Sequence, residues 1–164
     1  AMTGVHVPGR MEIIDMGQDF TAIVDYAHSP DAVERVISAV IPRGRRIVVL
    51  GCGGDRDREK RPEMGKIASE LADVAIVTSD NSRSEDPVAI IADICSGMGK
   101  TSAVKIVDRR DAIAHAVNIA QSGDVVVVAG KGHETAQLVG SSRLPFSDVE
   151  ELELAFAQKE AATQ

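Results

Sequence analysis

Short apolar runs that alternate with amphipathic stretches constrain the fold more than any other feature of this sequence. The runs lie at 20–25, 46–50, 74–78, 104–107 and 125–128. In the stretches between them, apolar residues recur at the spacing of a buried helix face. Strands separated by helical patterns of about 10 to 15 residues predict right-handed βαβ units. We therefore expect an α/β fold, a Rossmann-like, doubly wound and mostly parallel sheet with helices on both faces.

The two ends of the sequence add one strand and one helix to this series. A β-type run at 11–15 precedes the run at 20–25, and the two are separated by Met16-Gly17-Gln18-Asp19. This spacing favours a hairpin, so we expect an antiparallel N-terminal edge strand. Near the other end, Ser147 and Glu150 have the spacing of a capping box that opens a last helix.

Composition narrows the classes of partner. The 164 residues fit a single domain, 1–164, in which we interpret 1–6 as a linker or a cloning remnant. The formal net charge of −7, without a dominant basic face, argues against nucleic acid or an anionic membrane as the main partner. No apolar run approaches the roughly 20 residues of a membrane span, so we expect a cytoplasmic protein. Cys52 and Cys95 fit no metal-ligand spacing.

Two glycine-rich stretches resemble nucleotide-binding loops without completing either motif. Gly51-Cys52-Gly53 begins like a dinucleotide fingerprint, but Arg56 stands where the third glycine belongs. Arg56, flanked by acids, can bind a carboxylate or phosphate, or can belong to a salt-bridge network within the loop. The stretch 97–101 looks like the end of a Walker A loop, yet Ile94 replaces its first glycine and a helix precedes it. We interpret 97–101 as a helix end.

Polar residues follow the predicted strands at four places, beginning at Asp25, Gly51, Asp80 and Gly130. In open α/β sheets the ligand crevice lies outside the carboxyl ends of the strands, so these stretches are expected to meet. Each has a structural explanation when taken alone, such as a turn with a solvated arginine or local hydrogen bonding by a histidine. Together they bring both signs of charge to one edge, which suits an anionic or zwitterionic, amino-acid-like ligand.

Taken together, several stretches resemble the C-terminal domain of the Mur ligases, in particular the branch that adds the third amino acid of the peptidoglycan stem peptide. The resemblance implies an ATP- and Mg²⁺-dependent amide ligation. The D-glutamate carboxylate of UDP-MurNAc-L-Ala-D-Glu is phosphorylated, and an incoming amine then attacks the acyl phosphate. The matching stretches are Val7–Glu12, Asp25–Asp31, Gly51–Arg61, Asp80–Arg83 and Gly130–Glu134.

The resemblance also implies roles for individual residues. In the branch that adds meso-diaminopimelate the recognition motif is Asp-Asn-Pro-Arg, which falls here on Asp80, Asn81, Ser82 and Arg83, with serine in place of proline. Arg83 would bind the carboxylate that lysine lacks. Neither a catalytic residue nor a metal ligand is assigned to this chain. The other implied diaminopimelate contacts are Arg56, Gly130 and Glu134, and the residues implied to approach ATP are Arg10, Asp25 and His28.

The Walker-type loop and the carbamylated lysine of the family belong to a central ATPase domain, and UDP-sugar binding belongs to an N-terminal domain. We therefore expect this chain to act as one domain of a longer ligase and to lack ligase turnover by itself. Two alternatives remain open at this stage. One is a lysine-adding or polyglutamate-type ligase domain, and the other is a non-catalytic Rossmann module that binds NAD or another nucleotide.

Overall fold

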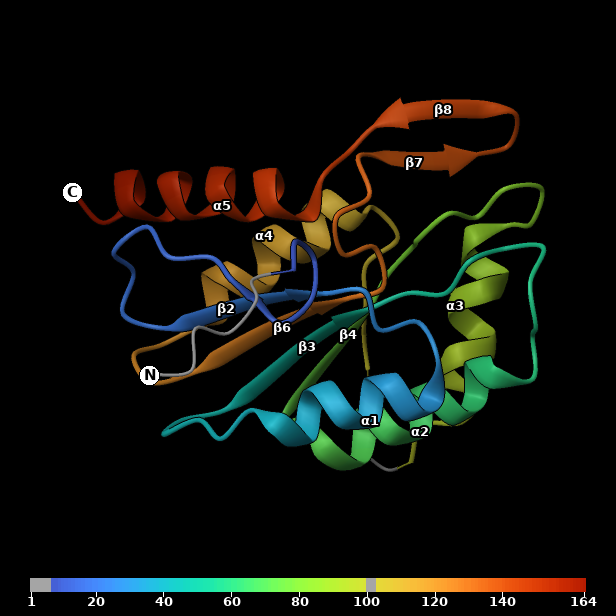
Figure 1. Cartoon of the computed structure of the whole chain (residues 1–164), viewed down its shortest axis with the longest axis horizontal. Coiled ribbons are helices and arrows are strands. Elements are labelled where there is room, and N and C mark those ends of the chain that lie inside the picture. Colours follow the sequence, from blue (N-terminus) through green and yellow to red (C-terminus); the bar gives the residue numbers. More distant parts are fainter. Residues whose placement is uncertain (1–6, 100–102) are drawn as a thin grey trace.

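The computed structural model describes residues 7–99 and 103–164, and within them a six-stranded sheet lies between two helical layers (Figure 1). The interpretation of residues 1–6 as a linker or remnant falls outside the described residues. The strand order is β1-β2-β6-β3-β4-β5, in which β1 pairs antiparallel with β2 and the other neighbours are parallel. This confirms the predicted sheet and its antiparallel edge. The strands are β1 Glu12–Ile13, β2 Thr21–Asp25, β3 Arg46–Leu50, β4 Val74–Val77, β5 Val104–Lys105 and β6 Val125–Ala129.

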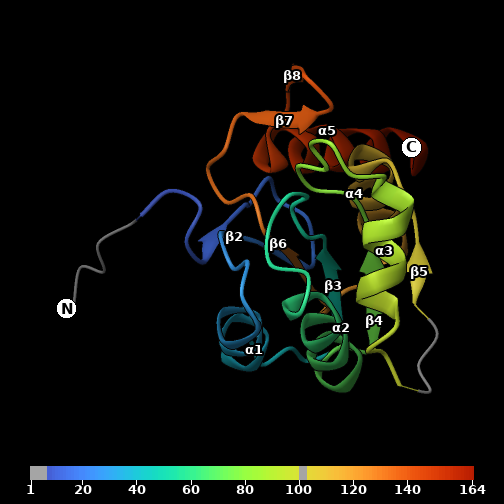
Figure 2. The same ribbon diagram turned by 90° about the vertical axis from the view of Figure 1, so that its right-hand side faces the viewer.

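Helices cover both faces of the sheet, as predicted (Figures 1 and 2). Alternate residues of β3 belong to two separate apolar cores, Val48 to one and Ile47 to the other, because successive side chains of a strand point to opposite faces. Helices α1 Pro30–Ala39, α2 Lys60–Leu71 and α3 Pro87–Cys95 pack on the Val48 side, and α4 Arg109–Ile119 and α5 Asp148–Ala162 on the Ile47 side.

Local signals explain where these helices begin. The Ser29 hydroxyl accepts a hydrogen bond from Ala32 N at 3.3 Å, directly before a proline at the first helical position. Ser147 caps α5 in the same way, accepting from Glu150 N at 3.3 Å, as the capping box predicts. In the part of the chain that the structure describes, no helix is both long and apolar enough to cross a bilayer.

The chain path brings the predicted loops together. Strands β2 and β3 follow each other in the sequence, but they are not neighbours in the sheet. Strand β6, which the chain reaches from β5 through α4, lies between them. As a result, the parallel strands β2, β6, β3 and β4 are direct neighbours and end at the same edge of the sheet. The loops after these strands are the four stretches that begin at Asp25, Gly51, Asp80 and Gly130.

An antiparallel hairpin, β7 Ala136–Val139 and β8 Ser142–Pro145, is the main element that the sequence did not predict. Its strands carry no clear alternation of apolar and polar residues, and every residue of β8 is exposed. The hairpin lies beyond the end of β6, above the same edge of the sheet (Figure 1). It therefore becomes part of the surroundings of the predicted loops.

Candidate functional site

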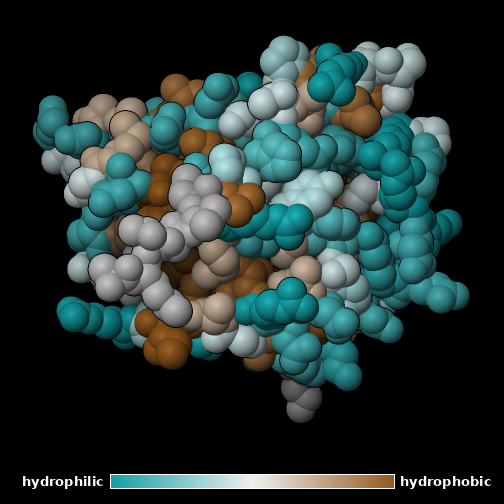
Figure 3. All heavy atoms as spheres, in the orientation of Figure 1, coloured by the Kyte–Doolittle hydropathy of each residue, from teal (hydrophilic) through white to brown (hydrophobic). Residues whose placement is uncertain are grey.

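A hollow of about 380 Å³ lies where β2, β6, β3 and β4 end. Seven of the predicted site residues line it, whereas Arg10, Asp25 and Ser82 do not. Figure 3 shows hydrophilic side chains gathered over the side of the molecule on which these strands end. A larger hollow, of about 600 Å³, lies between Phe20 and α5 and contains none of the predicted residues. The lining of the smaller hollow is Tyr26, His28, Gly53, Arg56, Asp57, Lys60, Asp80, Asn81, Arg83, Gly130 and Glu134.

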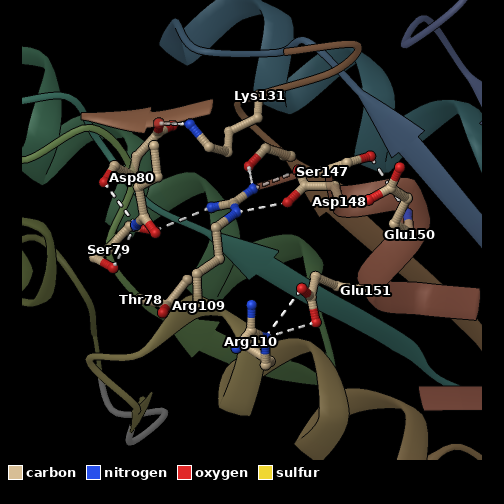
Figure 4. A network of polar contacts seen from close by, with 12 residues as sticks. Thr78, Ser79, Asp80, Arg109, Arg110, Lys131, Ser147, Asp148, Glu150 and Glu151 are labelled. Atoms are coloured by element: carbon tan, nitrogen blue, oxygen red, sulfur yellow. Dashed lines mark hydrogen bonds and ion pairs between the residues drawn. The ribbon is translucent and has the colours of Figure 1, made fainter. Parts of the chain in front are cut away.

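A buried ammonium group lies behind the loop Asp80–Arg83. Lys131 is fully buried, and its Nζ lies 3.3 Å from Asp80 Oδ1 (Figure 4). The same Nζ lies 2.8 Å from Asn81 Oδ1. Asp80 and Asn81 are themselves almost buried. On the far side of the amide, Asn81 Nδ2 donates to Glu134 Oε2 at 3.4 Å. Three predicted site residues are thus joined into one cluster by a lysine that sequence reasoning did not assign to the site, although it stands between two glycines at a strand end.

A second buried cation, Arg109, fixes the ends of two strands. Its guanidinium binds both carboxylate oxygens of Asp148, at 2.7 and 2.8 Å, and both side chains are fully buried. It also donates to the carbonyl oxygens of Ser79, at 3.2 Å, and Ala129, at 3.1 Å (Figure 4). Burial alone would lower the pKa of Arg109, but the carboxylates around it, Asp148 first and then Asp80 and Glu134, together outweigh burial and raise it. Arg109 therefore stays charged and holds the main chain directly before Asp80 and Gly130.

The glycine-rich loop that begins at Gly51 packs against the loop Asp80–Arg83, which explains its glycines without a nucleotide. A Cβ at Gly54 would lie 1.9 Å from the carbonyl oxygen of Ser82. Gly54 N donates to Asn81 O at 2.7 Å, and Gly54 O accepts from Arg83 Nη1 at 3.0 Å. The neighbouring Asp55 carboxylate binds Ser84 rather than Arg56, accepting from Ser84 Oγ at 2.5 Å and from Ser84 N at 3.2 Å.

A buried arginine, Arg61, connects the glycine-rich loop to the segment that follows Arg83. Arg61 binds both oxygens of Glu85, at 2.8 and 2.9 Å, and donates to the carbonyl oxygen of Gly53 at 3.0 Å. The same guanidinium donates to Asp93 at 3.0 Å. Hydrogen bonds from Arg61, and secondarily from Asp55 N, lower the pKa of Glu85 to about 2. Arg56, in contrast, is exposed and lies at the rim of the hollow, where its guanidinium donates to the carbonyl of Asp55 at 2.9 Å.

Arg83 has a left-handed backbone conformation, with φ of 50°. Such a conformation costs a residue other than glycine on the order of 1–3 kcal/mol and persists only where the surroundings enforce it. Here β7 supplies the enforcement, because Arg83 N donates to Leu138 O at 3.1 Å and Gly140 N donates to Arg83 O at 2.7 Å. The unpredicted hairpin therefore sets the direction in which the Arg83 side chain leaves the loop.

The three residues that the resemblance places near ATP form a separate group around Tyr26. Each carboxylate oxygen of Asp25 accepts a backbone N–H, from Ala27 and from Met11, at 2.8 Å. His28 Nδ1 lies 2.7 Å from the carbonyl oxygen of Tyr26, so the ring bonds the preceding turn rather than the following helix. Arg10 is exposed, and its guanidinium lies 5.2 Å from the centre of the Tyr26 ring.

Comparison with known proteins decides the family. The family described as "Mur ligase, glutamate ligase domain" matches residues 9–132. The chain belongs to the Mur ligase family. Mur ligase relatives named UDP-N-acetylmuramoyl-L-alanyl-D-glutamate–2,6-diaminopimelate ligase include one from Syntrophomonas wolfei, 56% identical over 87% of this chain and 30% of its own length. Another, from Synechococcus elongatus, is 51% identical over 96% of this chain and 33% of its own length.

A solved Mur ligase structure agrees with this assignment. A structure titled as a UDP-N-acetylmuramoyl-L-alanyl-D-glutamate–2,6-diaminopimelate ligase superposes on 98% of this chain with a TM-score of 0.86 and 41% identity. The chain covers 33% of that structure. It thus spans about a third of the length of the Mur ligases that it matches, and corresponds to the C-terminal domain of such proteins.

Proposed function

We propose that this chain is the amino-acid-binding domain, 1–164, of an ATP-dependent ligase that adds meso-diaminopimelate to UDP-MurNAc-L-Ala-D-Glu in the cytoplasm. The observation that carries the proposal is the hollow at the strand ends, where Arg83, Asn81 and Glu134 lie within one lining of mixed charge. Meso-diaminopimelate has two carboxylates and two ammonium groups, so it needs donors and acceptors together. The names of the relatives support the same substrate.

Arg83 is proposed to select the amino acid. One of its N–H groups is bound to Gly54 O, which fixes the guanidinium, and the guanidinium carries further donors that can bind a carboxylate. Lysine differs from diaminopimelate by the absence of that carboxylate, and binding it would leave the guanidinium unpaired. Arg56 offers a second cation at the rim, and Asp80 and Glu134 offer acceptors for an ammonium group. Gly130 leaves the space that these contacts require, since a Cβ there would lie 2.8 Å from Asp80 Oδ2.

The contribution of the chain to the chemistry is then orientation of the attacking amine. When bound, ATP supplies the phosphoryl group that activates the D-glutamate carboxylate. Arg10 and His28 are exposed cationic or polar groups that fit an approach to phosphate, and His28 lines the hollow. The oxygens of Asp25 each already accept one amide, so its first task is to hold the segment that carries Arg10. We propose that Mg²⁺ is held largely by the other domains. In residues 7–99 and 103–164 no group of three or more acidic, cysteine or histidine side chains is placed to bind a metal.

The test is an amino acid panel with the full-length ligase that contains this chain. Product formation is measured with UDP-MurNAc-L-Ala-D-Glu, ATP and either meso-diaminopimelate, lysine or glutamate. The proposal predicts the highest kcat/KM with meso-diaminopimelate. A higher value with lysine or glutamate would assign the chain to another branch of the family, and NAD binding without any ligase activity would favour a nucleotide-binding module.

A further inference from the structure

We propose that Lys131 is a positioning residue for amino acid selection, an inference that rests on the function proposed above. Lysine is almost never fully buried unless its ammonium group is paired. Here the pairing partners are the recognition side chains themselves, Asp80 and Asn81, at 3.3 and 2.8 Å. Arg109, another buried cation beside the loop, binds main-chain carbonyls and Asp148 instead. Lys131 is therefore placed to control side-chain orientation, and Arg109 to control the backbone.

The contacts of Asn81 show what Lys131 orients. Asn81 Oδ1 accepts two hydrogen bonds, one from Lys131 Nζ at 2.8 Å and one from Leu138 N at 2.9 Å. Both partners can only donate, so the amide oxygen must face them and the NH₂ group must point the other way. That NH₂ group donates to Glu134 and belongs to the lining of the hollow. Lys131, together with Leu138 N, thus makes Asn81 present donors, which suit a carboxylate, to the bound amino acid.

Lys131 also balances the charge behind the hollow. Asp80 and Glu134 both line the hollow, and both are linked to Lys131, Asp80 directly and Glu134 through Asn81. Removal of Lys131 would take this ion-pair partner away from the buried Asp80 carboxylate. A buried carboxylate that has lost its partner destabilises the folded protein. The Lys131 ammonium group therefore offsets the negative charge of Asp80 and Glu134. The carboxylates of the ligand can then approach the NH₂ group of Asn81 with less repulsion.

The test is Lys131→Met in the full-length ligase, with exposed Lys66→Met as the matched control. Loss of the charge-assisted hydrogen bond that helps to orient the Asn81 amide should raise KM for meso-diaminopimelate about tenfold to a hundredfold. The same substitution should lower the preference for meso-diaminopimelate over lysine. The kcat of the reaction and the KM for ATP should each change less than about threefold. A purely structural role would not separate the amino acid KM from these other parameters.

A folded Lys131→Met enzyme with unchanged KM and unchanged preference would overturn the inference. If Lys131→Met does not fold, Asp80→Asn and the Asp80→Asn/Lys131→Met double variant are compared, because the double variant carries no unpaired charge. The inference then predicts a further rise in KM from the single to the double variant, and equal values would refute it. Wild-type enzyme without meso-diaminopimelate ligation would instead refute the proposed function on which the inference rests.

Discussion

Arg83 combines a strained backbone with a charged side chain beside a hollow. The strain is offset by backbone hydrogen bonds from β7, and the guanidinium is steadied by Gly54 O. Its neighbour Ser82 is buried and stands where the resemblance implies a proline. The backbone geometry of this loop therefore depends on its neighbours more than on its own sequence.

Ser82→Pro is expected to be tolerated. Within the described residues, no hydrogen bond from Ser82 N is seen, and the carbonyl that accepts from Glu85 N at 3.0 Å is retained in proline. Proline also restricts the unfolded chain, so we expect the free energy of unfolding to stay level or rise by about 0.4–1 kcal/mol. Denaturant unfolding and the KM for meso-diaminopimelate measure this, and a loss of stability above about 1 kcal/mol would show that the loop needs serine.

The ion pair between Glu85 and Arg61 should make the stability of the protein depend on pH in the acid range. Because hydrogen bonds from Arg61 lower the folded pKa of Glu85 from 4.5 to about 2, its stabilising contribution is complete above pH 4.5 and is lost as the pH falls toward 2. Glu85→Gln should therefore lower Tm at pH 7, and the difference from wild type should shrink between pH 4.5 and 2. Exposed Glu70→Gln is the control. A difference that stays constant over this range would contradict the assignment.

Among the elements, those with strong periodicity were predictable and those that depend on distant partners were not. The apolar runs indicated β3 and β6, and helical spacing indicated α1 to α5. The hairpin β7–β8 was missed because its half-exposed strands pair locally and carry no alternation. The burial and the partners of Lys131 and Arg109 could not be predicted, because these partners lie 50 and 39 residues away, at Asn81 and Asp148, and only the tertiary structure shows the pairing.

Helix α5 allows a matched test of its buried face. Phe156 is buried and packs edge-on against Phe20, with ring centroids 5.5 Å apart, whereas Leu154 is 55% exposed. We expect Phe156→Ala to lower the free energy of unfolding by about 3–5 kcal/mol and Leu154→Ala by less than about 0.5 kcal/mol. Denaturant titration compares the two, and similar losses would mean that α5 is placed differently.

The whole molecule has a core on each face of its sheet and a polar edge where the strands end. The parallel sheet, the helices on both faces and the polar strand ends could all be predicted from the sequence. The resemblance to the Mur ligases supplied the candidate residues at that edge. What the sequence could not supply was the division between residues that reach the hollow, such as Arg56 and Arg83, and residues that hold the surrounding loops from inside the protein, such as Arg61 and Lys131. The chain spans about a third of its relatives, so activity is expected only from the longer protein.

The isolated 164-residue chain is therefore expected to show no ligase turnover. Orientation of the amino acid alone does not activate the D-glutamate carboxylate, so phosphate release from ATP should stay at background with all substrates present. A coupled phosphate assay measures this, with the full-length ligase as the positive control. Phosphate release that requires both meso-diaminopimelate and UDP-MurNAc-L-Ala-D-Glu would show that the chain is sufficient.

The central claim is that the strand-end hollow selects meso-diaminopimelate through Arg83. The most direct test is the ratio of kcat/KM for meso-diaminopimelate to that for lysine in the full-length ligase, for wild type, Arg83→Ala and the exposed control Arg35→Ala. Loss of a charge-assisted pair should reduce the ratio at least about tenfold in Arg83→Ala, through KM for meso-diaminopimelate, and leave it unchanged in the control. An Arg83→Ala enzyme that keeps the wild-type ratio would contradict the account.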